Sequence, residues 1–256
     1  MKIGLALSGG GARGFAHVGA LKVLAEHKVP IDLIAGTSAG SIVGGALAAG
    51  MSVPEIEEMA FAAGWLDLVR PSLPIGGLLS NAPMDGFLRR HLPVDRLENV
   101  AIPFTAVAFD LETNTPVLLG EQGDLITAIR ASCAVPGIFS PVRDNRGRML
   151  IDGGVVSPLP VETVRAMGAD IVIAIDVISC GATFRTRSRT GFGVLIQGAL
   201  ALLKVVSSAE QKAADVVIKP AVAHLRPDQI GKRVECIALG ESAAREKIDE
   251  ILTLIR

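Results

Sequence analysis

The chain has 256 residues, half of them apolar, and a formal net charge of −1 at neutral pH. This balanced charge argues against a general nucleic-acid-binding protein, and the length is compatible with one large domain or two small ones. The three cysteines are odd in number and widely spaced, which suits a reducing compartment and fits neither a disulfide framework nor a cysteine metal site.

The sequence shows no targeting or membrane-spanning pattern. The N-terminal segment lacks the long apolar region and the cleavage site of a secretory signal. No run of about 18 or more apolar residues stands out as a membrane span, since the nearest candidate, residues 31–53, is interrupted by Asp32 and several glycines. We therefore expect a soluble, cytoplasmic protein without a transmembrane segment, with peripheral contact to the inner membrane as a further expectation.

Short apolar runs alternate with helical patterns along the chain. The expected strands cover residues 2–7, 31–36, 104–109, 116–120, 148–152, 170–178 and 215–220. The expected helices cover residues 14–28, 38–50, a segment that begins with Ser52 as cap and Pro54 in the first turn, and 232–256. This alternation predicts an α/β fold with a mostly parallel central sheet flanked by helices. Residues 65–83 and 180–192 look irregular, and we interpret both as flaps near a site.

A serine lies where the second expected strand meets a helix of small residues. The segment Gly36-Thr37-Ser38-Ala39-Gly40 has the Gly-x-Ser-x-Gly pattern of a nucleophile elbow, in which a sharp turn exposes the serine hydroxyl. The helix that follows would place its N-terminal dipole beneath a developing negative charge. The competing interpretation is that small residues merely fill a tight turn.

A glycine loop follows the first expected strand and opens the first helix. Its Gly9-x-Gly11-x-x-Gly14 spacing also satisfies the dinucleotide-binding fingerprint. That site requires an acidic residue at the end of the second strand, whereas Asp32 stands at its beginning. The alternative is an oxyanion hole, since glycines can turn several backbone N–H groups toward one point. Arg13 would brace this loop or attract an anionic head group.

A nucleophilic serine needs a base, and the sequence gives only weak support for a histidine in that role. His91 and His224 follow Ser38 in the sequence, and His224 also follows Asp152 and Asp176, so a triad is formally available. A lone histidine in such a segment is more often structural. Cys133 has no histidine nearby in the sequence, and we interpret it as a buried free thiol.

Three motifs in order resemble one family. The segments GGGARG, GTSAG and IDGGVVSPLP, together with ASCAVPGIFSPV at 131–142, resemble the patatin-like phospholipases, in particular the bacterial proteins related to the catalytic domain of neuropathy target esterase. The resemblance covers residues 2 to about 180. It implies a three-layer patatin-like fold, with residues 1–256 forming a single domain.

The resemblance also implies a serine hydrolase with a Ser–Asp dyad and no histidine. Ser38 is then the nucleophile and Asp152 the general base. The motif residues are, for the oxyanion hole, Gly9, Gly10, Gly11, Ala12, Arg13 and Gly14; for the elbow, Gly36, Thr37, Ala39 and Gly40; and for the Asp-Gly-Gly motif, Gly153 and Gly154. No metal or organic cofactor is implied, and the expected substrate is a phospholipid or a lysophospholipid.

Two surfaces bear on the substrate. The apolar segment 65–83, which contains Trp65, is interpreted either as the lining of an acyl-chain groove or as ordinary core. The arginines at 143, 146, 148, 185, 187 and 189 are interpreted either as contacts to anionic lipid or as solvated loops.

Two rival functions stay open at this point. One is a non-catalytic regulatory or binding protein that retains the fold. The other is a histidine-assisted esterase or thioesterase that uses His224. The acyl-chain length, the head-group preference and the oligomeric state are not set by the sequence.

Overall fold

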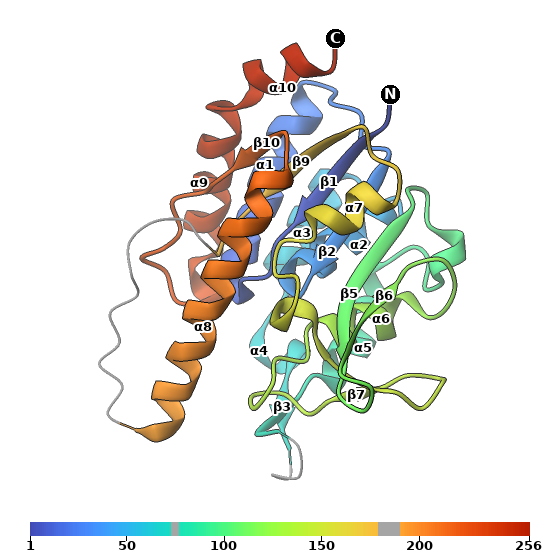
Figure 1. Cartoon of the computed structure of the whole chain (residues 1–256), viewed down its shortest axis with the longest axis vertical. Coiled ribbons are helices and arrows are strands. Elements are labelled where there is room, and N and C mark those ends of the chain that lie inside the picture. Colours follow the sequence, from blue (N-terminus) through green and yellow to red (C-terminus); the bar gives the residue numbers. More distant parts are fainter. Residues whose placement is uncertain (73–76, 179–189) are drawn as a thin grey trace.

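The computed structural model describes residues 1–72, 77–178 and 190–256, apart from the side chains of 192 and 196. Within them, an eight-stranded sheet lies between helices (Figure 1). Its strands are β1 (Ile3–Leu7), β2 (Leu33–Thr37), β5 (Phe104–Asp110), β6 (Thr115–Leu119), β7 (Val142–Arg143), β8 (Met149–Asp152), β9 (Ile171–Ile175) and β10 (Val216–Ile218). A separate small ribbon pairs β3 (Arg70–Pro71) with β4 (Leu79–Ser80).

The strand order is β10-β9-β1-β2-β5-β8-β7, and β6 also pairs with β5. The first five of these strands are parallel, whereas β6 and β8 run antiparallel to β5 and β7 runs antiparallel to β8. The parallel strands β1 and β2 are buried at every position, as expected for strands covered on both faces. The predicted fold class, a mostly parallel sheet flanked by helices, is confirmed.

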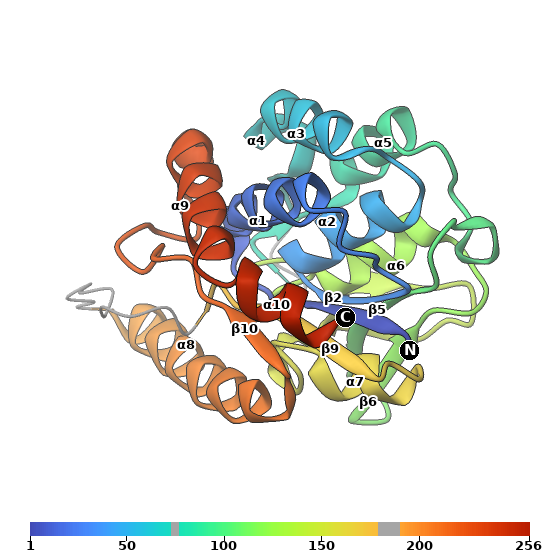
Figure 2. The ribbon, with the colours of Figure 1, turned by 90° about the horizontal axis from the view of Figure 1, so that it is seen from above.

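Helices cover both faces of the sheet (Figure 2). They are α1 (Phe15–Glu26), α2 (Ala39–Ala48), α3 (Val53–Ala62), α4 (Trp65–Leu68), α5 (Ala82–His91), α6 (Leu125–Ser132), α7 (Val161–Ala166), α8 (Gly191–Glu210), α9 (Arg233–Arg245) and α10 (Ile248–Leu254). Alternation along β1 assigns Leu5 and Leu7 to the main core and Ala6 to a second core beneath α7.

Ser52 caps α3 as predicted. Its side chain accepts a hydrogen bond from the Glu55 N–H, and the Glu55 carboxylate accepts one from the Ser52 N–H, forming a capping box. The tail from 232, predicted as one helix, is instead divided into α9 and α10, with Glu246 and Lys247 between them.

The sequence-based interpretation missed α8. The flap predicted at 180–192 overlaps Thr190, which caps α8, and the first two residues of the helix, whereas residues 180–189 lie outside the described residues. By length and composition alone, the helical stretch Gly193–Ala213 could cross a membrane, with a mean hydropathy of 1.4. We expected no transmembrane segment, but among the described residues this one helix is long and apolar enough to be a candidate.

Candidate active site

Ser38 and Asp152 come together because β2 and β8 lie end to end along one edge of β5. Thr37, the last residue of β2, pairs with Val107, and Asp152, the last residue of β8, pairs with Ala108. The other edge of β5 is occupied by β6, so β2 and β8 share the remaining one. Strand register thus brings the elbow serine and the motif aspartate to the same point of the sheet.

The backbone of Ser38 adopts the conformation expected of a sharp elbow. Its φ is 52° and its ψ is −123°, a combination that non-glycine residues rarely adopt. The Ser38 N–H donates to the Ser132 hydroxyl at 2.9 Å, and the same hydroxyl donates to the Val107 carbonyl at 2.6 Å. Backbone strain of this kind persists only where surrounding contacts hold it, and Ser132 supplies one of them.

Asp152 is a buried carboxylate beside the serine. It is 5% exposed, its Oδ1 accepts a hydrogen bond from the Gly154 N–H at 2.7 Å, and the Ser38 side chain lies near enough to lower its pKa. Burial raises the pKa of Asp152 to about 6, and the hydrogen bonds from Ser38 and Gly154 oppose this rise. A carboxylate with a pKa near neutrality accepts a proton more readily than one in water.

The glycine loop lies against the elbow. A Cβ atom added to Gly9 would stand 3.3 Å from the Cβ of Ser38, and Gly10, at φ +152°, has a backbone conformation that side chains disfavour. The Gly9 N–H donates to the Pro158 carbonyl and the Ala12 N–H to the Pro227 carbonyl. Among the described residues, the N–H groups of Gly10 and Gly11 have no partner, so they are the amides of the loop that stay available to a substrate.

One segment after the Asp-Gly-Gly motif holds both other motifs in place. The Ser157 carbonyl accepts from the Thr37 hydroxyl at 2.8 Å, and the Pro158 carbonyl accepts from Gly9 at 3.0 Å. Its own anchor is Glu210 of α8, which accepts from the Ser157 hydroxyl and, at 2.8 Å, from the Leu159 N–H. The three motifs therefore form one connected unit.

Arg13 braces the glycine loop. Its guanidinium donates to the carbonyls of Leu225 and Ala223, at 2.8 and 3.2 Å. These contacts favour the bracing role over the attraction of a head group.

The histidines and Cys133 have other partners. His224 is exposed and pairs with Glu235 at 2.8 Å, and buried His17 contacts the Ser8 carbonyl at 2.9 Å. Cys133 is buried next to Ser41 and Ser38, and burial raises the pKa of its thiol, which keeps the thiol protonated and unreactive.

The two surfaces proposed for substrate contact differ in exposure. Trp65, Leu66 and Leu78 are exposed, which removes the interpretation of this segment as ordinary core for these three side chains. Arg148 pairs with Asp144 at 2.7 Å, and the arginines at 185, 187 and 189 lie outside the described residues.

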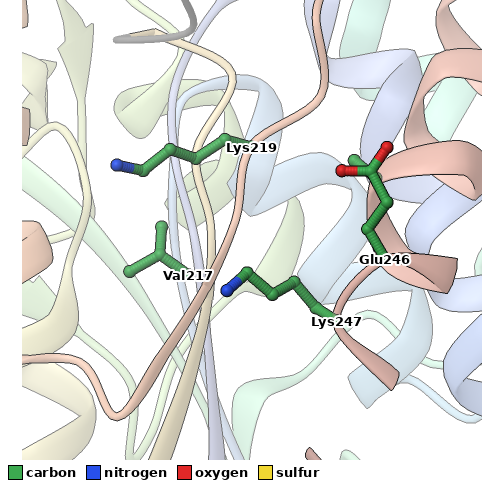
Figure 3. A pocket seen from close by; sticks show the side chains of 5 residues that line it. Val217, Lys219, Glu246 and Lys247 are labelled. Carbon is green, nitrogen blue, oxygen red and sulfur yellow. The ribbon is translucent and has the colours of Figure 1, made fainter. Parts of the chain in front are cut away.

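A surface hollow elsewhere contains no residue of the three motifs. It is lined by Val217, Lys219, Ala243, Glu246 and Lys247, between β10 and the end of α9 (Figure 3). In the sheet, β9 and β1 separate β10 from β2. Among the described residues, no group of histidine, cysteine and acidic side chains is arranged to hold a metal ion.

Sequence reasoning missed Ser132 and the anchor at Glu210. Ser132 lies in the quoted segment ASCAVPG, but there only the cysteine was considered as a functional group. Glu210 could not be found, because its role depends on where α8 packs.

Comparison with known proteins places these features in a family. Residues 5–165, more than half of the chain, match the model of the family described as patatin-like phospholipase. An uncharacterized NTE family protein of Mycobacterium tuberculosis is 38% identical over 182 residues, which cover 69% of this chain and 49% of that protein. Patatin-like phospholipase domain-containing protein 6 of Homo sapiens is 35% identical over 182 residues, covering 68% of this chain and 13% of that protein.

A solved structure agrees in fold. VipD from Legionella pneumophila has a TM-score of 0.57 at 15% identity, and the match covers 97% of this chain and 67% of VipD. The chain spans about half the length, or less, of the curated relatives named above.

Proposed function

The chain belongs to the patatin-like phospholipase family, whose members are lipid ester hydrolases, and from this premise we propose that it cleaves acyl esters of phospholipids or lysophospholipids through a dyad of Ser38 and Asp152. The observation that carries the proposal is the buried carboxylate of Asp152, which strand register brings beside Ser38 and whose pKa the Ser38 side chain lowers. The family supports lipid ester hydrolysis in general, and the dyad and the substrate are our own assignment.

The first step forms an acyl-enzyme. Asp152 takes the proton of the Ser38 hydroxyl as its oxygen attacks the ester carbonyl, and the carbonyl oxygen becomes an oxyanion. We assign the donors to that oxyanion to the amides of Gly10 and Gly11, because these N–H groups have no partner among the described residues, and the N-terminus of α2 adds its dipole. Protonated Asp152 then gives its proton to the leaving alcohol as the ester bond breaks.

The second step releases the fatty acid. Asp152, again a carboxylate, takes a proton from water, whose oxygen attacks the acyl carbon. The tetrahedral intermediate collapses, the bond to Ser38 breaks, and the proton returns from Asp152 to the serine oxygen. Because a single carboxylate serves both steps, its raised pKa and the glycine loop must together supply most of the rate enhancement.

Covalent labelling with a fluorophosphonate tests the nucleophile. We expect wild-type protein to carry one adduct, which peptide mass spectrometry assigns to Ser38, and to release fatty acid from lysophosphatidylcholine and from a short p-nitrophenyl ester. Ser38→Ala should lose both the adduct and hydrolysis. Wild-type protein that neither reacts with the probe nor hydrolyses either ester would favour a non-catalytic binding protein.

The pH dependence of hydrolysis should follow Asp152. The base acts only as a carboxylate, and its pKa is about 6, so kcat/KM for the short ester should fall about tenfold for each pH unit below that value and stay level above it. An ordinary exposed aspartate would give the same fall only below about pH 4. A level profile down to that pH would contradict the assignment of Asp152 as a buried base.

A further inference from the structure

The helix α8 is apolar and almost entirely unburied. Its 20 residues span about 30 Å, and only 6% of its most apolar window is buried in the protein. Five large apolar side chains on it are between 39 and 68% exposed: Val194, Leu195, Leu200, Leu202 and Val205. Isolated exposed leucines are ordinary in soluble proteins, but a cluster of this size on one helix marks an interaction site.

The exposure runs all the way round the helix. Residues 198–202 are all exposed, and five consecutive positions cover more than a full turn of about 3.6 residues. A protein partner that docks on one face would leave the other faces of this segment in water. A lipid layer surrounds an inserted helix and so covers all these positions at once.

The other end of α8 is fixed to the active site. The Ser207 hydroxyl donates to Asp176 at 2.6 Å, and Glu210 accepts from Ser157 and Leu159, which follow the Asp-Gly-Gly motif. The Cδ2 of Leu203 lies 3.2 Å from where a Cβ on Gly154 would stand. Val155, next to Gly154, is 45% exposed, so the residue that follows the Asp-Gly-Gly motif also presents an apolar side chain to the solvent.

The charge of α8 is consistent with the same occupant. The sequence from 191 to 209 contains one charged residue, Lys204, and no acidic residue that anionic lipid would repel.

We propose that the N-terminal half of α8 docks into the surface of a phospholipid layer and thereby holds the Ser38–Asp152 site at the membrane. The helix dips into the layer, with Val194, Leu195 and Leu202 among the acyl chains. Its C-terminal end stays in the protein, because Ser207 and Glu210 are bound there. The proposal deepens the proposed function, on which it rests for the identity of lipid as substrate.

Vesicle binding by the full chain tests the proposal. The vesicles would contain equal amounts of phosphatidylcholine and phosphatidylglycerol. The α8 variant would be a double substitution, Leu195→Ser together with Leu202→Ser. The matched control is Val234→Ser with Leu254→Ser, which alters two exposed apolar residues on α9 and α10. The α8 variant should lose about 100-fold in partitioning to vesicles, whereas the control should bind like wild type.

Hydrolysis and fluorescence separate this proposal from the proposed function. The α8 variant should hydrolyse a water-soluble ester as fast as wild type, and Ser38→Ala should bind vesicles normally while hydrolysing nothing. In a Trp65→Phe background, Leu202→Trp should show blue-shifted emission on vesicle addition, a readout that does not depend on weakening the helix.

Three results would overturn the proposal. In the first, wild type and the α8 variant bind vesicles equally. In the second, the emission of Leu202→Trp does not shift when vesicles are added. In the third, light scattering shows a wild-type dimer that the α8 substitutions convert to a monomer. The last would assign the helix to a second copy of the chain. If vesicles bind but no ester is cleaved by wild type, docking stands and the hydrolase proposal fails.

Discussion

Asp152→Asn should lower kcat by about 10³- to 10⁴-fold and leave KM for a short ester little changed. Asparagine keeps the size of the side chain and the acceptor for the Gly154 N–H, but it cannot take the proton of Ser38. General base catalysis contributes up to about 10⁴-fold to the rate, and the proposed dyad contains no second base to replace the Asp152 carboxylate.

The same substitution should stabilise the fold at neutral pH. Because burial raises the pKa of Asp152 from 3.8 to about 6, the folded state favours the protonated form, and stability is lost as the pH rises through this range. A neutral asparagine avoids that cost, which amounts to up to about 3 kcal/mol. Urea unfolding at pH 8 and pH 4 measures it: the gain should be present at pH 8 and largely absent at pH 4.

Measured together, kcat and the stability to urea show whether Asp152→Asn loses activity only because it misfolds. An inactive variant with a higher unfolding midpoint has lost a proton acceptor and not its structure. If Asp152→Asn keeps kcat within threefold of wild type, Asp152 is not the base. If it loses activity and stability together at pH 8, the carboxylate is structural.

Gly40→Ala should destabilise the protein by about 3 kcal/mol or more, a large share of the stability of an ordinary domain. A Cβ at Gly40 would lie 2.2 Å from the Leu7 carbonyl oxygen and 2.6 Å from that of Ser8. Both neighbours are backbone atoms of the strand and loop that carry the glycine motif, so α2 and β1 would have to move apart.

The matched control is Gly198→Ala in α8. Nothing lies within 4 Å of a Cβ at that position, and alanine favours a helix over glycine by up to about 1 kcal/mol, so this variant should be unchanged or slightly more stable. Urea midpoints compare the two. An unchanged midpoint for Gly40→Ala would mean that the elbow and the glycine loop do not pack as described.

The sequence predicted the part of the fold that local patterns encode. The strands that became β1, β2 and β9 are short apolar runs, and the Ser52 cap with Glu55 is a local signal, so these predictions are confirmed. The family resemblance is confirmed by the match over residues 5–165. The assignments of Ser38 and Asp152 stay predictions until activity is measured.

The missed features depend on contacts distant in sequence. The direction of β8 follows from its pairing with β5, and nothing within residues 148–152 encodes it. The Pro158 and Pro227 carbonyls accept hydrogen bonds from the N–H groups of Gly9 and Ala12. These distant contacts determine which amides of the glycine loop stay available. Helix α8 has almost no buried face and contains several glycines, so amphipathic periodicity did not mark it, although its composition is apolar.

The rate of fluorophosphonate attachment to Ser38 tests the dyad most directly, because it isolates the attack step from product release. We expect His224→Ala to react at the wild-type rate and Asp152→Asn to react at least about 10²-fold more slowly at pH 8. The contrary result, fast labelling of Asp152→Asn together with slow labelling of His224→Ala, would replace the dyad with a histidine-assisted serine.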